Sequence, residues 1–331
     1  MPELTPRDLK NTAQLRLATA ETIPRKLTAL HSGIALGAGV LVALSSLVLN
    51  LMIQNTGGLG DLGVRTVLGT MRTTLQLVVQ LLMPFWAAGF TCCGIGLARQ
   101  HAVGPKTLTE GLRRWGVVLR LNLCRGGLLL LLGYLTLQLA YTVFMMTPLA
   151  DNAIAIVETV MGNGTLPDLT TLPPDTMEQL LTALTPVYVL WAVVFVAVAL
   201  PILYRFRMAD FRIMDRERPG ALRAMAQSGL MMRGSRWKLC KLDLSYWWFY
   251  GAELGLSLLL YTEFLLGGLG VSLPMDSDLL YLLCYLIYAG ATFALHLFFR
   301  ARVETTYGVF YDRLLQVHKP PVPPQPRPPQ Y

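Results

Sequence analysis

Residues 219–263, PGALRAMAQSGLMMRGSRWKLCKLDLSYWWFYGAELGLSLLLYTE, decide the fold of this chain. The first half is basic and carries apolar side chains at helical spacing, which is typical of a helix that lies on a membrane surface. The second half, from Leu244 onward, is apolar enough to enter a bilayer. A surface helix that leads directly into a membrane span is therefore the unit we expect elsewhere in the chain.

The composition of the 331 residues predicts a membrane protein. Hydrophobic residues make up 53% of the chain and charged residues 15%, and the mean hydropathy is +0.48. Soluble globular chains of this length do not normally combine these values. Because backbone groups inside lipid must be satisfied within the segment itself, and no strand-like alternation is seen, the spans should be helices.

Six stretches are long and apolar enough to cross a bilayer, namely residues 30–53, 74–98, 121–146, 187–204, 244–266 and 279–299. We expect an all-α, polytopic helical bundle of about six spans over residues 30–299. A basic amphipathic segment, residues 1–29, precedes it. A post-span helix, residues 300–318, should follow with Phe310, Tyr311 and Leu314 on an interfacial face, and the proline-rich residues 319–331 should be disordered.

The distribution of charge predicts the orientation. Every Lys and Arg except Arg65 and Arg72 lies in the N-terminal segment, in two connecting loops or near the C-terminus, with the adjoining helix ends. The loop at residues 147–186 carries five acidic residues and no basic one. This asymmetry places both termini in the cytoplasm and indicates a multi-pass protein of the cytoplasmic (inner) membrane.

The basic segments before spans three and five are candidate contacts for the anionic inner leaflet. Each basic residue near such a leaflet contributes on the order of 1 kcal/mol. The helix bearing Leu222, Met225, Leu230 and Met231 should therefore lie flat on the inner surface. The candidate contacts are Arg113, Arg114, Trp115, Arg233, Arg236, Trp237, Lys238 and Lys241. Nucleic acid is not expected as a partner, because the longer basic loop has few aromatic residues for base stacking, with Trp237 the one that lies among its clustered basic residues.

The same two basic segments resemble each other. Arg114-Trp115 leads to Leu121-Asn122-Leu123, and Arg236-Trp237 leads to Leu242-Asp243-Leu244. One interpretation is a threefold repeat of an inner-surface helix plus a two-span hairpin. The other is that any helix entering lipid from the cytoplasm favours Trp with Lys or Arg at the interface.

Glu253, near the middle of the fifth predicted span, needs a partner because an ionisable side chain at that depth is costly. One interpretation is an ion- or proton-handling site. The other is a protonated glutamate in an interhelical hydrogen bond, with Gln76, Gln80, Gln138 or a tyrosine of the sixth span as partner.

Glu263 and His296 complete the candidate intramembrane polar site. Glu263 lies near the outer end of the fifth span, where an interfacial anchor is the simpler role. His296 reads as a packed, hydrogen-bonded imidazole more readily than as a metal ligand. The vicinal pair Cys92 and Cys93 favours packing over metal binding, because no His or acidic residue is nearby in sequence.

No catalytic motif appears in the predicted spans. An intramembrane enzyme would need paired aspartates, a zinc helix with two histidines, or a serine with a histidine. No metal or cofactor is predicted, and we expect a non-enzymatic membrane scaffold or accessory protein that contacts anionic lipid and a protein partner. The alternative is a small transporter or channel component that uses Glu253.

Two segments resemble the signature of a family of bacterial integral membrane proteins, the domain-of-unknown-function 975 family. The first runs from Ser228 through Met231, Met232, Gly234 and Trp237 to Lys241-Leu242 and Leu244-Ser245. The second consists of Thr306, Phe310, Tyr311 and Leu314. Where members of the family have Pro-Tyr ahead of the second segment, this chain has Ala301-Arg302. The resemblance implies a multi-span protein of the bacterial inner membrane, and it implies no activity or ligand.

Overall fold

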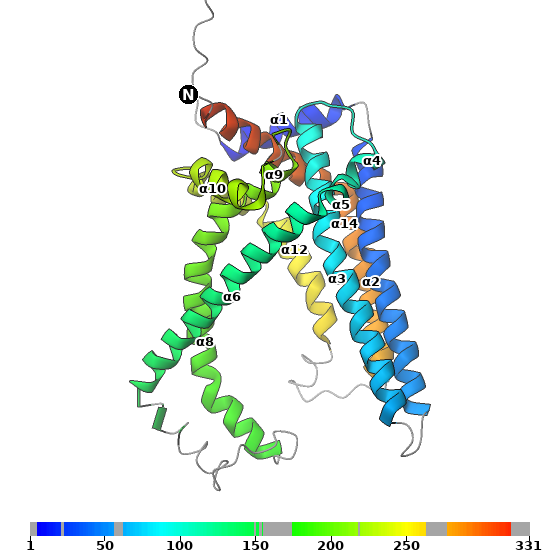
Figure 1. Cartoon of the computed structure of the whole chain (residues 1–331), viewed down its shortest axis with the longest axis vertical. Helices are drawn as coiled ribbons and strands as arrows, with labels where there is room; N and C mark the ends of the chain where they lie inside the picture. Colours follow the sequence, from blue (N-terminus) through cyan, green and yellow to red (C-terminus); the bar gives the residue numbers. More distant parts are fainter. Residues whose placement is uncertain are drawn as a thin grey trace, which may run out of the picture. The chain divides into compact units, whose positions relative to one another are not determined.

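The computed structural model describes residues 5–20, 23–55, 62–148, 150–151, 154, 174–217, 219–262 and 277–318. Throughout these ranges the regular structure is helical and contains no strand (Figure 1). The helices are α1 (Pro6–Ala18), α2 (Pro24–Asn55), α3 (Leu62–Ala98), α4 (Pro105–Leu108), α5 (Glu110–Arg113), α6 (Trp115–Met145), α8 (Pro174–Phe206), α9 (Ala209–Met214), α10 (Ala221–Met231), α11 (Arg236–Leu244), α12 (Trp247–Ser257), the 3-10 helix η2 (Leu258–Tyr261) and α14 (Ser277–His318). The proline-rich tail and most of the acidic loop lie outside the described residues.

Five helices are long and apolar enough to cross a membrane, so the chain is an all-α, multi-pass membrane protein. These segments are Pro24–Met52, Thr66–Ala98, Trp115–Met145, Thr182–Met214 and Leu279–His318. They contain or overlap five of the six predicted spans. The stretch predicted as the fifth span, residues 244–266, lies within the described residues as far as Thr262. This part consists of the end of α11, the whole of α12 and η2.

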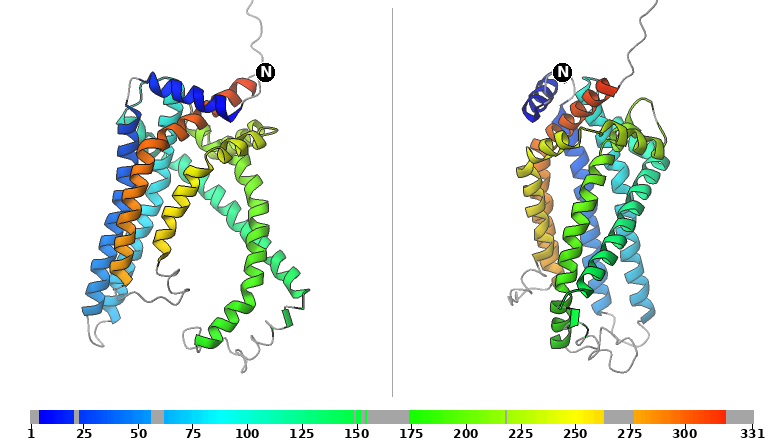
Figure 2. Two further views of the ribbon diagram at one scale, coloured as in Figure 1. Left: turned by 180° about the vertical axis from the view of Figure 1, so that it is seen from behind. Right: turned by 90° about the vertical axis from the view of Figure 1, so that its left-hand side faces the viewer.

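The chain forms two compact units, residues 1–121 with 206–331 and residues 122–205. In the larger unit α2, α3 and α14 pack along one another, as both views in Figure 2 show. Small residues permit the approach of α3 and α14: a Cβ on Gly308 would lie 2.7 Å from Gly94 O and 2.9 Å from Ala98 Cβ. In a membrane, where apolar burial gives little drive for helix association, such close backbone packing is a main source of attraction.

The short helices α4 and α5 are held against α3 by backbone-to-backbone contact. A Cβ on Gly89 would lie 1.8 Å from Leu108 O, and one on Gly111 would lie 1.9 Å from Phe85 O. Only glycine fits at these two positions without movement of a neighbour. A buried apolar cluster fills the space beside this contact; it consists of Leu27, Phe90, Cys93, Leu97, Val103 and Leu108.

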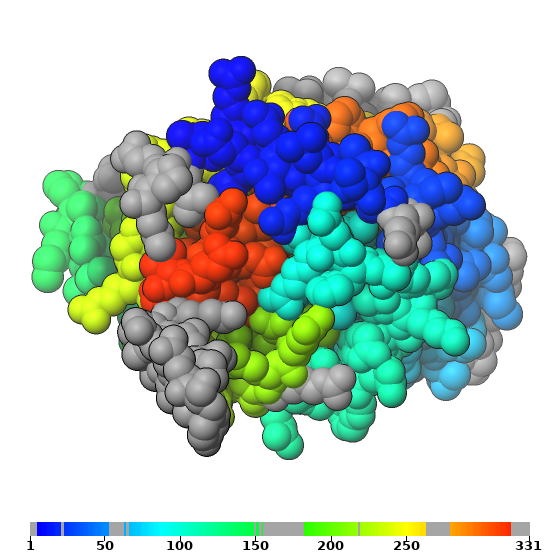
Figure 3. Space-filling view, turned by 90° about the horizontal axis from the view of Figure 1, so that it is seen from above, coloured from blue at the N-terminus to red at the C-terminus, as the bar shows by residue number. Residues whose placement is uncertain are grey.

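Helix α1 is anchored to the rest of the larger unit. Thr5 Oγ1 caps it by accepting from the Asp8 N–H at 3.2 Å. On its other side, Lys10 Nζ donates to Ser245 O at 2.6 Å and lies 4.0 Å from the centre of the Tyr246 ring. Figure 3 shows α1, in dark blue, next to the red end of α14. Helix α1 is thus packed on protein and is not a free surface helix.

Helix α10 was expected to lie flat on the inner membrane surface through four apolar residues, and the burial of two of them differs from that expectation. Met225 and Met231 are buried, whereas Leu222 and Leu230 are exposed. The apolar face that the sequence assigned to lipid is therefore used mainly for packing against α9 and α14. The prediction was wrong for the two methionines, because helical periodicity indicates an apolar face without indicating whether lipid or protein covers it.

Helix α14 joins the sixth predicted span and the post-span helix into one element of 42 residues, about 63 Å long at helical rise. One face of its final third is buried against other elements: Phe310, Tyr311 and Leu314 are 0%, 0% and 2% exposed. Their predicted location at a lipid interface was wrong, since α1, α3 and α10 all pack on α14.

The smaller unit contains the main parts of α6 and α8. Trp191 Nε1 on α8 donates to Gly133 O on α6 at 3.1 Å, and the Trp191 and Phe195 rings stack with centroids 5.8 Å apart. Helix α8 runs through Pro186 and Pro201. The predicted fourth span, residues 187–204, is therefore the second part of a helix that begins at Pro174.

Candidate functional site

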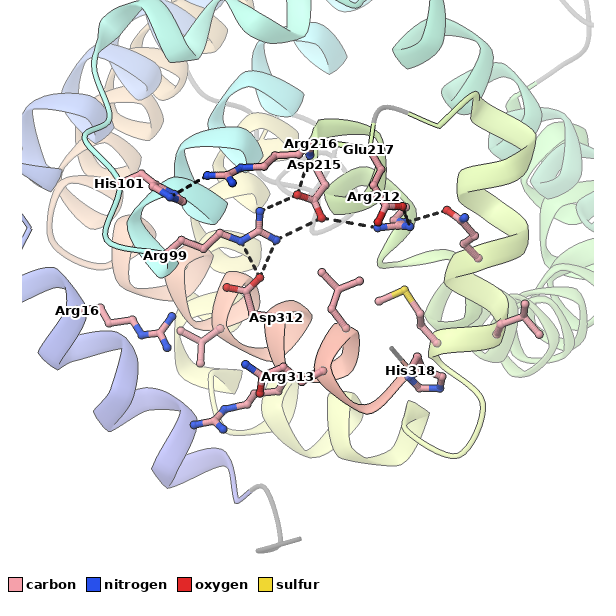
Figure 4. A pocket seen from close by; sticks show the side chains of 16 residues that line it. Arg16, Arg99, His101, Arg212, Asp215, Arg216, Glu217, Asp312, Arg313 and His318 are labelled. Atoms are coloured by element: carbon pink, nitrogen blue, oxygen red, sulfur yellow. Dashed lines mark hydrogen bonds and ion pairs between the residues drawn. The ribbon is translucent and has the colours of Figure 1, made fainter. Parts of the chain in front are cut away.

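A network of ion pairs and hydrogen bonds joins the ends of α3, α9 and α14. Arg99, the residue after α3, donates from Nη1 to Asp215 Oδ1 at 2.6 Å and from Nε to Asp312 Oδ1 at 2.9 Å. Tyr311 Oη donates to Asp215 Oδ2 at 2.8 Å. The two aspartates lie 116 and 213 residues from Arg99 in sequence. One guanidinium therefore connects three distant parts of the chain (Figure 4).

Asp215 is ionised in this network. The residue is 6% exposed, and burial alone would raise the pKa of its carboxyl group. Hydrogen bonds from Arg99, Tyr311 and the Arg216 backbone N–H outweigh burial and hold that pKa at about 2. Burial also opposes the charge on Arg99, but its bonds to Asp215 and Asp312 raise the pKa of the guanidinium above its ordinary value. Arg99 and Asp215 therefore form a charged pair at neutral pH.

Arg212 places a second guanidinium beside the same carboxylate. Its Nη1 lies 3.7 Å from Asp215 Oδ2, and its Nε donates to Gln227 Oε1 at 2.8 Å. Its Nη2 forms an ion pair with Glu217. Since Arg212 is 7% exposed, its charge needs these partners. Asp215 is consequently held between two arginines.

A cavity of about 740 Å³ opens beside this network. Arg99, Arg212 and Asp215 form part of its wall, and α1 and α14 contribute Arg16 and Arg313 (Figure 4). Its lining holds five arginines against three carboxylates. The cavity therefore carries net positive charge before any contribution from its two histidines.

A row of tyrosine contacts fixes the junction of α11 and α12 on α14. Tyr307 Oη donates to the Asp243 carboxylate, and it lies 2.6 Å from Tyr250 Oη. Tyr246 Oη lies 2.9 Å from Thr306 Oγ1. These contacts explain why the segment predicted as one continuous span is interrupted near Ser245.

The structure brings Glu253 and His296 together. His296 Nε2 lies 2.7 Å from Glu253 Oε1, and His296 Nδ1 lies 3.0 Å from Ser32 Oγ. With the proton on Nε2, the ring donates to the carboxylate and its Nδ1 accepts from the serine hydroxyl. Arg300 Nη1 lies 3.8 Å from the same carboxylate oxygen. A cavity of about 440 Å³ adjoins the pair, and Tyr288 lines it.

The other residues of the predicted intramembrane site are not part of this cluster. Gln76 and Gln80 are exposed on α3, and neither makes a hydrogen bond within the described ranges. Glu263 lies outside the described residues. Glu253 thus pairs with His296, which the sequence analysis had selected as a separate candidate. The partners that the sequence analysis had named for Glu253 were glutamines or a tyrosine of the sixth span.

The predicted lipid-contact residues divide into two groups. Exposed side chains are Arg113, Trp115, Arg233, Arg236, Trp237, Lys238 and Lys241. Arg114 differs, because it is half-buried and its Nη1 donates to Ile213 O at 2.5 Å. Arg113 also pairs with Glu110 at 2.7 Å. Arg114 therefore connects α5 to α9 and is unavailable to lipid.

The two motifs quoted from the sequence meet around α14. Ser228, Met232 and Leu242 are completely buried, Thr306 contacts Tyr246, and Tyr311 donates to Asp215. Gly234 has a φ of +79°, a conformation that side-chain-bearing residues rarely adopt. Most motif residues therefore build the protein interior at this end of the molecule.

Sequence reasoning missed the Arg99–Asp215–Asp312 network. The available signal was the position of Asp215 and Asp312 inside the two basic stretches that surround them. An acidic residue in such a stretch often neutralises a buried arginine. Among the described residues, no three His, Cys, Asp or Glu side chains gather as a metal site requires, and all five cysteines are free.

A family model described as "Protein of unknown function (DUF975)" matches residues 23–318. The matched stretch includes every helix from α2 to α14, and it therefore includes both polar clusters. Helix α1, with Arg16, precedes it. Comparison of the chain with curated proteins and with solved structures gave no match.

Proposed function

We propose that this chain, which belongs to the DUF975 family, is a non-enzymatic protein of the bacterial inner membrane that binds anionic lipid through α11. The observation that carries the proposal is the arrangement of charge on this helix. Leu239 and Leu242 are 0% exposed and face the protein, whereas Arg236, Lys238 and Lys241 are exposed. The helix thus presents its cations outward as a set.

Aromatic and apolar side chains next to these cations support membrane contact. Trp237, Leu244 and Trp247 are 68%, 68% and 69% exposed. Large apolar side chains that the protein leaves this exposed mark a surface that lipid or another partner covers. Tryptophan favours the headgroup region of a bilayer. In a scaffold or accessory role, the same surface would contact a protein partner as well as lipid.

The proposal includes six spans with both termini in the cytoplasm. Five helices are long and apolar enough to supply five of these spans, and α12 with η2 would supply most of the remaining one. Leu254 and Leu258 on this segment are 65% and 48% exposed, which fits contact with lipid. The order of elements also supports the threefold repeat: α1 precedes the long helices α2 and α3, α4 and α5 precede α6 and α8, and α9, α10 and α11 precede the shorter α12 and the long α14.

Neutralising the cationic face of α11 tests the proposal. We expect the full-length variant Arg236→Gln/Lys238→Gln/Lys241→Gln to lose its preference for phosphatidylglycerol over phosphatidylcholine by about ten-fold or more, since each charge near an anionic surface contributes on the order of 1 kcal/mol. The measurement is the lipid retained by protein purified from nanodiscs that contain both lipids in equal amounts. The preference of the unaltered protein should also weaken as salt rises.

A charge-preserving variant is the matched control. Arg236→Lys/Lys238→Arg/Lys241→Arg changes the same three side chains and keeps their charge, so it should retain the preference. Equal lipid retention by the neutral and the charge-preserving variants would overturn the proposal.

The Glu253–His296 pair favours a second candidate, a transporter or channel component that moves protons. A carboxylate and an imidazole 2.7 Å apart can exchange a proton, and the adjoining cavity of about 440 Å³ has room for water. Ser32 extends the chain of polar groups to α2.

Glu253→Gln is expected to reduce proton flux to the level of protein-free liposomes, because an amide keeps the size of the side chain and cannot take up a proton. The measurement is the response of an enclosed pH-sensitive dye to an imposed pH gradient. Glu110→Gln, which alters a carboxylate outside the spans, should leave flux unchanged. Equal flux in Glu253→Gln and the unaltered protein would reject this second candidate.

A further inference from the structure

We infer that the larger cavity is a binding site for a phosphate monoester, whose phosphate group is held by Arg16, Arg313 and Arg216. This inference goes beyond the lipid-binding surface of α11, because none of the residues proposed there lines the cavity. Either proposal can fail while the other stands.

Part of the cavity wall is built from charged side chains that are already paired with one another. Arg99 is bound to Asp215 and Asp312, and Arg212 is bound to Glu217 and Gln227. These arginines hold the architecture in place and would not need to move when an anion arrives. Such fixed surroundings lower the cost of ordering a bound ligand.

The rim of the cavity carries the cations that remain available. Arg16 on α1 and Arg313 on α14 line it, and the guanidinium group of neither makes an ion pair or hydrogen bond within the part of the chain that the structure describes. Among the described residues, the side-chain contact of the Arg216 guanidinium is with an imidazole and not with a carboxylate: its Nη2 lies 3.0 Å from His101 Nε2. Arginine forks match the geometry of phosphate oxygens and can bind them in pairs.

The sequence separation of these arginines argues for an assembled site. They come from residues 16, 216 and 313, on α1, the turn after α9, and α14. The positive-inside rule accounts for basic residues near the cytoplasmic end of each membrane helix. It does not account for basic residues from three separate elements that line one cavity. Glu217 also lines the cavity, but its carboxylate is occupied by Arg212.

The size and the remaining lining indicate an organic ester in preference to inorganic phosphate alone. At about 740 Å³ the cavity falls in the usual range for small-molecule sites. Leu230, Met231 and Leu315 supply apolar surface beside the arginines. A ligand with a phosphate at one end and a less polar group at the other fits this division. Both a soluble ester and the headgroup of phosphatidic acid have this chemistry.

The test compares two double variants that remove the same charge. Arg16→Gln/Arg313→Gln alters the cavity rim, whereas Arg7→Gln/Arg223→Gln alters exposed arginines on α1 and α10 that do not line the cavity. Binding of glycerol 3-phosphate to full-length protein in a neutral detergent is measured by calorimetry at constant ionic strength. Phosphatidic acid in nanodiscs of otherwise neutral lipid forms the second arm.

We expect the rim variant to weaken binding about ten-fold or more, because it removes two charge-assisted contacts, while the control variant binds as the unaltered protein does. Binding of glycerol 3-phosphate identifies a soluble ester as the ligand source; binding of phosphatidic acid alone identifies a lipid headgroup. The α11 triple variant should bind normally in both arms. Absence of binding in both arms, or equal weakening in the two double variants, would overturn the inference.

Discussion

Replacing Arg99 by alanine is expected to destabilise the folded protein by about 3–5 kcal/mol. The substitution leaves Asp215, 6% exposed, without its main cationic partner, and it also frees Asp312. A buried carboxylate that loses its main cationic partner costs far more than the ion pair itself contributes, and Arg212 Nη1, 3.7 Å from Asp215 Oδ2, compensates only in part. The measurement is the thermal or denaturant unfolding of purified protein in one detergent.

The matched control is Arg113→Ala, which removes an arginine that is 74% exposed and paired with Glu110 at 2.7 Å. We expect a change within about 0.5 kcal/mol. Adding Asp215→Asn to Arg99→Ala should recover part of the stability, because it removes the buried negative charge that has lost its main partner. If Arg99→Ala were no more harmful than Arg113→Ala, the network would not be a structural anchor.

Acid titration gives an independent measure of the same pair. The pKa of Asp215 is about 2 in the folded protein and about 3.9 in an unfolded chain. Its ionised form therefore contributes roughly 2–3 kcal/mol that is fully present above about pH 4–5 and is lost as pH falls through about 2. The difference in stability between the unaltered protein and Asp215→Asn should narrow over that window.

Gly89→Ala is expected to destabilise the protein by about 3 kcal/mol, near the upper end for overpacking. The new Cβ would lie 1.8 Å from Leu108 O and 2.7 Å from Leu108 C. Because both atoms belong to the backbone, relief requires α4 to move away from α3. Unfolding of the purified variant, measured as for Arg99→Ala, gives the size of the effect.

Gly37→Ala on α2 provides the comparison, since nothing lies within 4 Å of its added Cβ. Alanine favours a helix over glycine by up to about 1 kcal/mol, so this variant should be as stable as the unaltered protein or more so. Equal stability of the two alanine variants would mean that α4 does not approach α3 as closely as the structure has it.

Much of the fold could be predicted from the sequence because the bilayer fixes the length and polarity of a spanning helix. Residues 300–318 were expected as a helix after the last span, and α14 does continue to His318, because polar residues are compatible with a helix beyond the lipid. The boundaries of the fifth span were less accessible. The interruption near Ser245 depends on contacts with Lys10 and Thr306, which no local pattern encodes.

The candidate sites were predictable to different degrees. Glu253 and His296 stood out singly because ionisable residues in apolar stretches are costly, but their pairing depends on how α12 and α14 are rotated. Arg99 and Asp215 did not stand out. In a basic loop, charged residues look solvated, and only the fold shows that these two are buried.

The unbroken course of α14 has a mechanical consequence. His296 and Arg313 lie on one continuous helix, 17 residues and about 26 Å apart along its axis. A membrane-embedded helix adjusts its tilt to bilayer thickness. Over that lever arm, a change of about 10° in tilt displaces the distal end by about 4 Å. The thickness of the surrounding bilayer would thereby alter the width of the arginine-lined cavity near the C-terminal end of α14.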